Sequence, residues 1–174
     1  MSEIQLKARQ IQLLILDVDG VMTNGGLQFD ARGSEYKTFN SLDGQGMRML
    51  LECGIQIAVI TGRKSKLVDH RMNDLGVKLV FQGNRDKRPA FSELLNKTGL
   101  ARSQIAYLGD DLPDLAIMGQ VGMSIAVKNA HAFVKQQAHW VTLANGGSGA
   151  VREVTDFILE AQNLLDAKQS SYLQ

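Results

Sequence analysis

Short runs of apolar residues recur along the chain, and segments in which apolar residues recur every three or four positions separate them. Continuous apolar runs bounded by turn residues are typical of buried strands, and spacings of three and four are typical of helices. The pattern predicts strands at residues 11–17, 55–60, 77–81, 104–108, 122–127 and 140–143. It predicts helices at residues 47–54, 65–75, 86–97, from about 113, at 131–137 and at 150–167.

A different pattern interrupts the chain after the first strand. Two short alternating runs flank a glycine-containing turn, which predicts a β-hairpin over about 26–39. A hairpin between a first strand and its helix is an insertion into an α/β plan. We expect it to be either a small lid or a contact between subunits.

Strand and helix alternate from one end of the chain to the other, which predicts an α/β fold with a doubly wound, mostly parallel sheet. We expect residues 1–174 to form one domain, with a mobile polar tail from about 168. In such sheets, ligands bind beyond the carboxyl ends of the strands. Candidate functional residues are therefore sought there.

Two carboxylates follow the first strand. Asp17 and Asp19 are two positions apart, so their side chains start on the same side of the strand. Two like charges at this distance are costly unless a cation offsets them. The pair predicts a site for a hard divalent cation, with Mg²⁺ as the default for oxygen ligands and phosphate chemistry.

Polar groups follow the next three strands as well: Thr61 and Gly62, then Lys87, then Asp110 and Asp111 with Asp114 one turn further on. Each of these motifs alone is common in turns and at helix starts. Their order along four strand ends is what favours one shared site for phosphoryl transfer. In this hypothesis Asp17 attacks phosphorus, and Asp19 protonates the leaving oxygen and later activates water.

The remaining groups fit the same chemistry. Asp17, the main-chain carbonyl of Asp19, and Asp110 would bind the cation. Thr61 and the Gly62 N–H would hold phosphoryl oxygens. Lys87, at a helix start, would neutralise charge on the transferring group.

These residues resemble the four motifs of the haloacid dehalogenase (HAD) superfamily of phosphatases. Further motifs resemble one branch of it, the 3-deoxy-D-manno-octulosonate 8-phosphate (KDO 8-phosphate) phosphatase family. They are Asp17-Val18-Asp19-Gly20-Val21-x-Thr23, Thr61-Gly62-Arg63, Asp74-Leu75-Gly76, Gln82-Gly83, Asp86-Lys87, Gly109-Asp110-Asp111 and Gly146-Gly147-x-Gly149-Ala150-x-Arg152-Glu153.

The resemblance implies a Mg²⁺-dependent enzyme of lipopolysaccharide precursor synthesis, without a cap domain. It also implies a homotetramer whose hairpins associate, and in which one subunit helps to close its neighbour's site. Asp111 would support the metal ligands from a second layer. The resemblance assigns the substrate's sugar to the loop Asn40, Ser41, Leu42, Asp43 and Gly44, and its carboxylate to Arg63 and Arg71.

Net charge, cysteine content and apolar run length indicate which partners and which compartment to expect. A net charge of +1 gives no reason to expect nucleic acid or an anionic membrane as a partner. The one cysteine, Cys53, cannot form an intrachain disulfide and suits a reducing compartment. Since no apolar run approaches the roughly 20 residues of a membrane span and the N-terminus is polar, we expect a cytoplasmic protein.

Three alternatives remain. One is a phosphatase for a nine-carbon sugar acid, 2-keto-3-deoxynonulosonate or N-acylneuraminate 9-phosphate. Relatives of that kind tend to be acidic at the position of Arg63, so arginine favours the eight-carbon substrate. A receiver module would carry its acidic pair on the first strand rather than late in the chain, and a non-catalytic interaction module would not need every motif intact.

Overall fold

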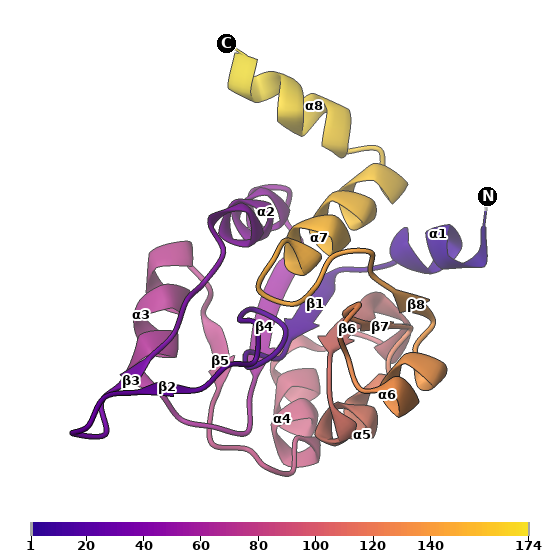
Figure 1. The fold of residues 1–174 in the computed structure, drawn as a ribbon. Coiled ribbons are helices and arrows are strands. Elements are labelled where there is room, and N and C mark those ends of the chain that lie inside the picture. The colour runs from indigo at the N-terminus through magenta and orange to yellow at the C-terminus, as the bar shows by residue number, and fades with distance from the viewer. Residues whose placement is uncertain (1, 174) are drawn as a thin grey trace.

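A parallel sheet forms the centre of the protein (Figure 1). The computed structural model describes residues 2–173 and, within them, places six parallel strands in one sheet, in the order β5-β4-β1-β6-β7-β8. The doubly wound α/β class is therefore confirmed. The strands are β1 (Leu13–Leu16), β4 (Gln56–Ile60), β5 (Leu79–Phe81), β6 (Ile105–Gly109), β7 (Met123–Ala126) and β8 (Trp140–Val141).

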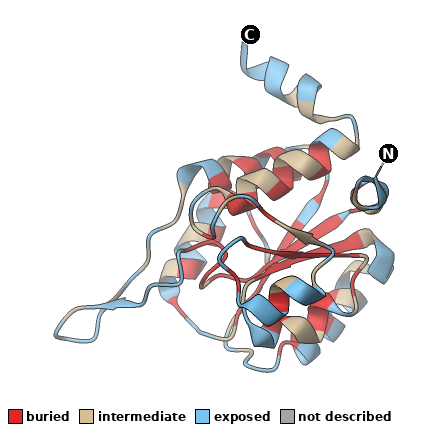
Figure 2. Cartoon of the chain, turned by 45° about the vertical axis from the view of Figure 1, so that its right-hand side comes forward, coloured by how far each residue is buried: buried red, intermediate tan, exposed pale blue. Residues whose placement is uncertain are grey.

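Helices cover both faces of the sheet, and the buried residues concentrate in the strands and on the helix sides that face them (Figure 2). One layer contains α1 (Glu3–Ala8), α2 (Ser41–Glu52), α3 (Lys66–Leu75) and α7 (Ala150–Ala161). The other contains α4 (Arg88–Thr98), α5 (Leu115–Met118) and α6 (Ala132–Gln137). Among the helices of residues 2–173, none has the length and apolar character needed to cross a membrane.

The central strand explains where the site lies. All four residues of β1 are fully buried because helices cover both of its faces. The strand pairs with β4 on one side and β6 on the other, and the chain changes direction across the sheet at this point. Open α/β sheets bind ligands at such a switch point, beyond the carboxyl ends of the strands.

The expected hairpin is present and extends from the body of the molecule (Figure 1). It consists of β2 (Gln28–Phe29) and β3 (Glu35–Tyr36), which pair antiparallel. Asp30 closes the turn, since its Oδ1 accepts hydrogen bonds from the N–H groups of Arg32 and Ser34. The phenylalanine and tyrosine of the two strands are each about half exposed.

The chain ends differ from the expectation. Helix α1 was not predicted from the polar N-terminus; a capping box between Ser2 and Gln5 begins it. The single helix expected over 150–167 is wrong, because Asn163 adopts a left-handed backbone (φ 58°) that ends α7. A separate helix, α8 (Leu165–Ser170), follows and then a 3₁₀ turn, Ser171–Leu173. Mobility of this tail stays a prediction.

A glycine pair holds the loop after β8 against the loop after β1. A Cβ on Gly146 would lie 1.7 Å from the main-chain oxygen of Gly20, so only glycine fits there. The N–H of Gly147 donates to the carbonyl of Val21 at 2.9 Å. The loop that carries Asp17 and Asp19 is thus fixed from the far end of the chain.

We expect Gly146→Ala to lower the free energy of unfolding by about 1–3 kcal/mol, because the added methyl forces two backbone segments apart. Chemical denaturation measures this change. Ser148→Ala, at an exposed position of the same loop, is the control and should be nearly neutral. Equal stability of the Gly146 variant and the wild type would contradict the close packing.

Candidate active site

A cavity of about 410 Å³ opens at the carboxyl ends of β1, β4 and β6, which is within the size range of small-molecule sites. It contains the residues expected from all four strand ends. Its lining is Asp17, Asp19, Thr61, Gly62, Arg63, Arg85, Lys87, Asp110, Asp111, Pro113 and Asp114.

Lys87 joins two carboxylates at the bottom of this cavity. Its Nζ lies 2.7 Å from Asp17 Oδ1 and 2.6 Å from Asp114 Oδ1, and donates to the Tyr107 hydroxyl at 3.0 Å. The lysine is 3% exposed, and a buried ammonium is tolerated only when it is paired. Burial alone would lower the pKa of Lys87, but the two carboxylates outweigh burial and raise it. Lys87 is therefore a fixed cation.

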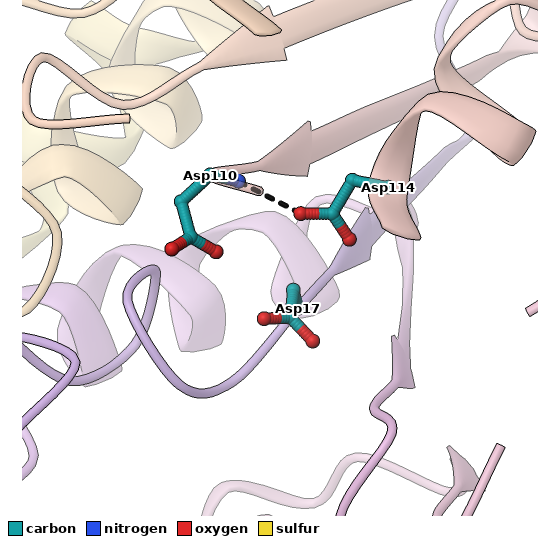
Figure 3. Close-up of side chains that lie close together, drawn as sticks. All are labelled: Asp17, Asp110 and Asp114. Atoms are coloured by element: carbon teal, nitrogen blue, oxygen red, sulfur yellow. Dashed lines mark hydrogen bonds between the residues drawn. The ribbon is translucent and has the colours of Figure 1, made fainter. Parts of the chain in front are cut away.

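Asp114 organises the group rather than facing the cavity with free oxygens. Its Oδ1 also accepts from the Tyr107 hydroxyl at 2.7 Å. Its Oδ2 accepts from the N–H of Asp110 at 2.8 Å (Figure 3) and from the N–H of Asp111 at 3.0 Å. Burial, followed by the charges of Asp114 and Asp17, raises the pKa of Tyr107 well above its usual value, so its hydroxyl stays a donor.

Three carboxyl groups lie close together in the cavity. Carboxylate oxygens of Asp17, Asp110 and Asp114 lie within 4.8 Å of one another. Burial, and then the charges of the neighbouring aspartates, raises the pKa of Asp110 to about 8. Burial raises the pKa of Asp17 to about 6, against the opposing charge of Lys87. One lysine does not balance three carboxylates.

This donor set fits a hard divalent cation. Carboxylate oxygens at close range are the ligands that Mg²⁺ prefers, and a cation would relieve the repulsion that raises these pKa values. Gly20, with φ +99°, gives Asp110 its place, since a Cβ there would lie 2.1 Å from Asp110 Oδ2. Because hydrogen bonds occupy Asp114, Asp17 and Asp110 are the side chains best placed to bind the ion.

Asp19 does not share the partners of Asp17 and instead lies close to two other cations. Lys37, which follows β3 of the hairpin, forms an ion pair with Asp19 Oδ1. Arg63 Nε lies 3.5 Å from Asp19 Oδ2. Lys37 and Arg63 both also contact Glu35, at 3.3 and 2.6 Å. The hairpin of the same chain thus contacts two residues of the cavity lining, Asp19 and Arg63.

The loop expected to contact the sugar lies outside the cavity lining and begins α2. Asn40 caps that helix, with its Oδ1 accepting from the N–H of Leu42 at 2.8 Å. Asp43 is 2% exposed and accepts from the N–H of Arg152 at 2.9 Å, at the start of α7. Burial raises the pKa of Asp43, and the N–H groups at the start of α7 oppose that shift. Asp43 therefore has a structural role in joining α2 to α7.

Arg71 is also away from the cavity lining. Its Nη1 donates to Asp74 Oδ2 at 2.9 Å, and its Nη2 packs so close to Gly44 that a Cβ there would lie 2.2 Å away. Ser41 and Leu42 are exposed. A substrate role for Asn40, Ser41, Leu42, Asp43, Gly44 and Arg71 stays a prediction.

Sequence reasoning missed four residues of the site: Tyr107, Arg85, Lys37 and Glu35. Two signals were available. Glu35 and Lys37 are two positions apart in a predicted strand, so they share one face while Tyr36 takes the other. Arg85 comes two residues before Lys87 in a loop that follows a strand. No signal singled out Tyr107 within its apolar run.

Comparison with known proteins agrees with this geometry. Residues 79–154 match the haloacid dehalogenase-like hydrolase family. The chain is 47% identical over 165 residues to the KDO 8-phosphate phosphatase KdsC of Escherichia coli K12, covering 95% of this chain and 88% of that protein.

Solved structures of the same kind of enzyme superpose closely on this chain. A KDO 8-phosphate phosphatase of Moraxella catarrhalis, in complex with magnesium, phosphate and KDO, superposes with a TM-score of 0.96 at 41% identity, covering 99% of both chains. The enzyme of Yersinia pestis superposes with a TM-score of 0.93 at 47% identity, covering 94% of this chain and 88% of that one.

The fold and the acidic site define a haloacid dehalogenase-like hydrolase, a phosphatase that uses Mg²⁺. Within that class, the chain belongs to the KDO 8-phosphate phosphatase family.

The raised carboxyl pKa values predict an unusual stability profile for the metal-free protein. A carboxyl whose pKa is raised on folding holds its proton in the folded state after the unfolded chain has lost it. The usual pKa of an aspartate is 3.8, and that of Asp110 in the folded protein is about 8. The stability that protonated Asp110 contributes should therefore be lost as the pH rises from 3.8 towards 8. We expect metal-free Asp110→Asn to melt a few degrees above wild type at pH 8, since about 1 kcal/mol shifts the melting temperature of such a domain by roughly 2–4 °C.

Calorimetry with and without Mg²⁺ checks this prediction. Mg²⁺ should raise the melting temperature of the wild type more at pH 8 than at pH 5, and should have little effect on Asp110→Asn. The exposed Asp166→Asn is the matched control and should behave as wild type. A full Mg²⁺ response in Asp110→Asn would show that the ion binds elsewhere.

Proposed function

We propose that this protein hydrolyses KDO 8-phosphate to the free sugar acid and phosphate, in lipopolysaccharide precursor synthesis. The observation that carries the proposal is the buried pair of Asp17 and Lys87 beside Asp110, in a cavity open to a small molecule. The similarity to enzymes named for this substrate supports the choice of sugar.

Asp17 is the nucleophile. Lys87 holds its Oδ1 at 2.7 Å, which leaves Oδ2 as the oxygen that attacks phosphorus and forms an acyl phosphate. Asp19, in the cavity wall, protonates the leaving sugar oxygen. Asp19 then takes a proton from the water that releases phosphate from Asp17.

The other groups bind the phosphoryl oxygens and the metal. Thr61 is 3% exposed and lines the cavity beside Gly62, so its hydroxyl and the glycine N–H can hold phosphoryl oxygens. Lys87 contributes its fixed charge to the same group. Asp17, the main-chain carbonyl of Asp19, and Asp110 would hold Mg²⁺, with Asp111 as a supporting residue. When bound, the ion neutralises charge on the phosphoryl group.

The cavity also offers cations for the sugar carboxylate. Arg63 has 42% of its side chain exposed, and Arg85 lies in the same wall. Guanidinium groups bind carboxylates through two parallel hydrogen bonds. Arg63 favours an eight-carbon substrate over the alternative, a nine-carbon sugar acid phosphate.

We further propose a homotetramer in the cytoplasm. Leu27, Phe29 and Tyr36 of the hairpin are 50, 54 and 55% exposed, so the projecting hairpin offers apolar side chains for contacts between proteins. This supports the expected association of hairpins.

A kinetic screen of sugar acid phosphates with Mg²⁺ tests the proposed function. We expect KDO 8-phosphate to have the highest kcat/KM of the panel. Asp17→Asn should lower phosphate release by at least about 10³-fold, because the acyl phosphate cannot form. Asp166→Asn serves as the control. A nine-carbon substrate with the higher kcat/KM would favour the alternative, and unchanged activity of Asp17→Asn would reject the mechanism.

A second experiment addresses Arg63. We expect Arg63→Glu to reduce kcat/KM for KDO 8-phosphate at least tenfold more than for an aryl phosphate, because only the sugar acid carries a carboxylate. Lys64→Glu makes the same charge change at the exposed neighbouring position. Equal losses on both substrates would exclude a role of Arg63 in specificity.

A further inference from the structure

Four charged side chains form a closed ring beside the cavity. Lys37 contacts Asp19 and Glu35, and Arg63 contacts the same two carboxylates from the other side. Two ring members come from the hairpin, one follows β1 and one follows β4. Opposite charges alternate around the ring.

Lys37 is the least exposed member of the ring. Its side chain is 2% exposed, compared with 17% for Asp19 and 42% for Arg63. An ammonium buried to this extent must be paired, and both of its carboxylate partners are close. Removing Lys37 would leave Arg63 as the remaining ring cation for both Asp19 and Glu35.

Glu35 keeps Lys37 in place. Burial alone would raise the pKa of Glu35, but hydrogen bonds from Ser65 and Arg63 and the charge of Lys37 hold it below its usual value. Glu35 is therefore an anion that binds both cations of the ring. Phe29, from the other hairpin strand, lies under the Arg63 guanidinium at 5.9 Å. The folded hairpin fixes both cations that contact Asp19.

The two oxygens of Asp19 are not equivalent. Lys37 engages Oδ1 directly, whereas the cation nearest to Oδ2 is Arg63 Nε at 3.5 Å, beyond ordinary hydrogen-bond length. Oδ2 is thus the oxygen left to face a leaving group. The lysine sets the rotation of the carboxyl group.

We propose that Lys37 is a positioning residue: it holds the Asp19 carboxyl group by Oδ1 so that Oδ2 can deliver its proton to the leaving oxygen. The inference deepens the proposed function and rests on it. Lys37 does not touch the substrate in this assignment; it acts through Asp19.

Substrates with different leaving groups can test the role of Lys37. A sugar alkoxide needs a proton to depart, whereas p-nitrophenolate departs without one. A misplaced Asp19 should therefore slow the sugar phosphate and spare p-nitrophenyl phosphate. A lysine that instead stabilised charge on the phosphoryl group, or only the fold, would affect both substrates alike.

The experiment compares kcat/KM, which reports formation of the phosphorylated enzyme, for both substrates in Lys37→Met. We expect a loss of about 10- to 100-fold for KDO 8-phosphate, which is part of the roughly 10²- to 10⁴-fold that a general acid contributes, and a change of less than about threefold for p-nitrophenyl phosphate. Lys66→Met, at an exposed lysine, is the matched control and should leave both values unchanged. Equal losses, or no loss, in Lys37→Met would overturn the proposal.

A double-mutant cycle tests whether Lys37 acts through Asp19. Asp19→Asn combined with Lys37→Met should be within about threefold of Asp19→Asn alone on the sugar phosphate. Multiplied losses would overturn the proposal. If Asp19→Asn itself slowed both substrates equally, the acid role of Asp19 in the proposed function would fail instead.

If Lys37→Met folds poorly, Glu35→Gln provides a second test. Glu35→Gln keeps the shape of the side chain and removes the anion that holds Lys37. It should slow the sugar phosphate several-fold more than p-nitrophenyl phosphate. Equal effects on the two substrates in this variant would also overturn the proposal.

Discussion

The ion pair between Lys87 and Asp17, 2.7 Å long and buried under the carboxyl end of the sheet, is the contact on which the site depends. Neither charge could be buried alone at acceptable cost. Asp114 and Tyr107 complete the group, so that β1, β6 and the start of α4 are held at fixed separations. The surplus negative charge that remains after this pairing is what a divalent cation can offset.

The same arrangement is repeated for the second aspartate. Lys87 lies between Asp17 and Asp114, and Lys37 lies between Asp19 and Glu35, so Asp17 and Asp19 each share a buried lysine with a second acid. The two lysines come from different elements, Lys87 from the start of α4 and Lys37 from the segment after β3. Two neighbouring aspartates can therefore keep separate orientations, which separate roles in attack and proton transfer require.

Parallel-sheet geometry explains why part of the site could be predicted from the sequence. Strand ends that meet at one edge bring Asp17, Thr61, Lys87 and Asp110 together whatever the details of packing. Contacts that depend on how distant segments pack could not be predicted. Asp43 reads as a polar loop residue, yet it binds the backbone of α7, 109 positions away in the sequence. In the sequence Tyr107 is one residue of an apolar strand, and only the structure shows that its hydroxyl donates to Asp114.

The hairpin shows how an insertion can serve the site and the surface together. Alternation along β3 and the residue after it turns Glu35 and Lys37 to one side, where Lys37 pairs with Asp19, and leaves Tyr36 exposed on the other. A displacement of the hairpin would move Lys37 and would take Glu35 away from Arg63, so it would affect both cations that contact Asp19. Any contact made on its outer side would therefore be coupled, through Lys37, to the position of Asp19, the proposed proton donor.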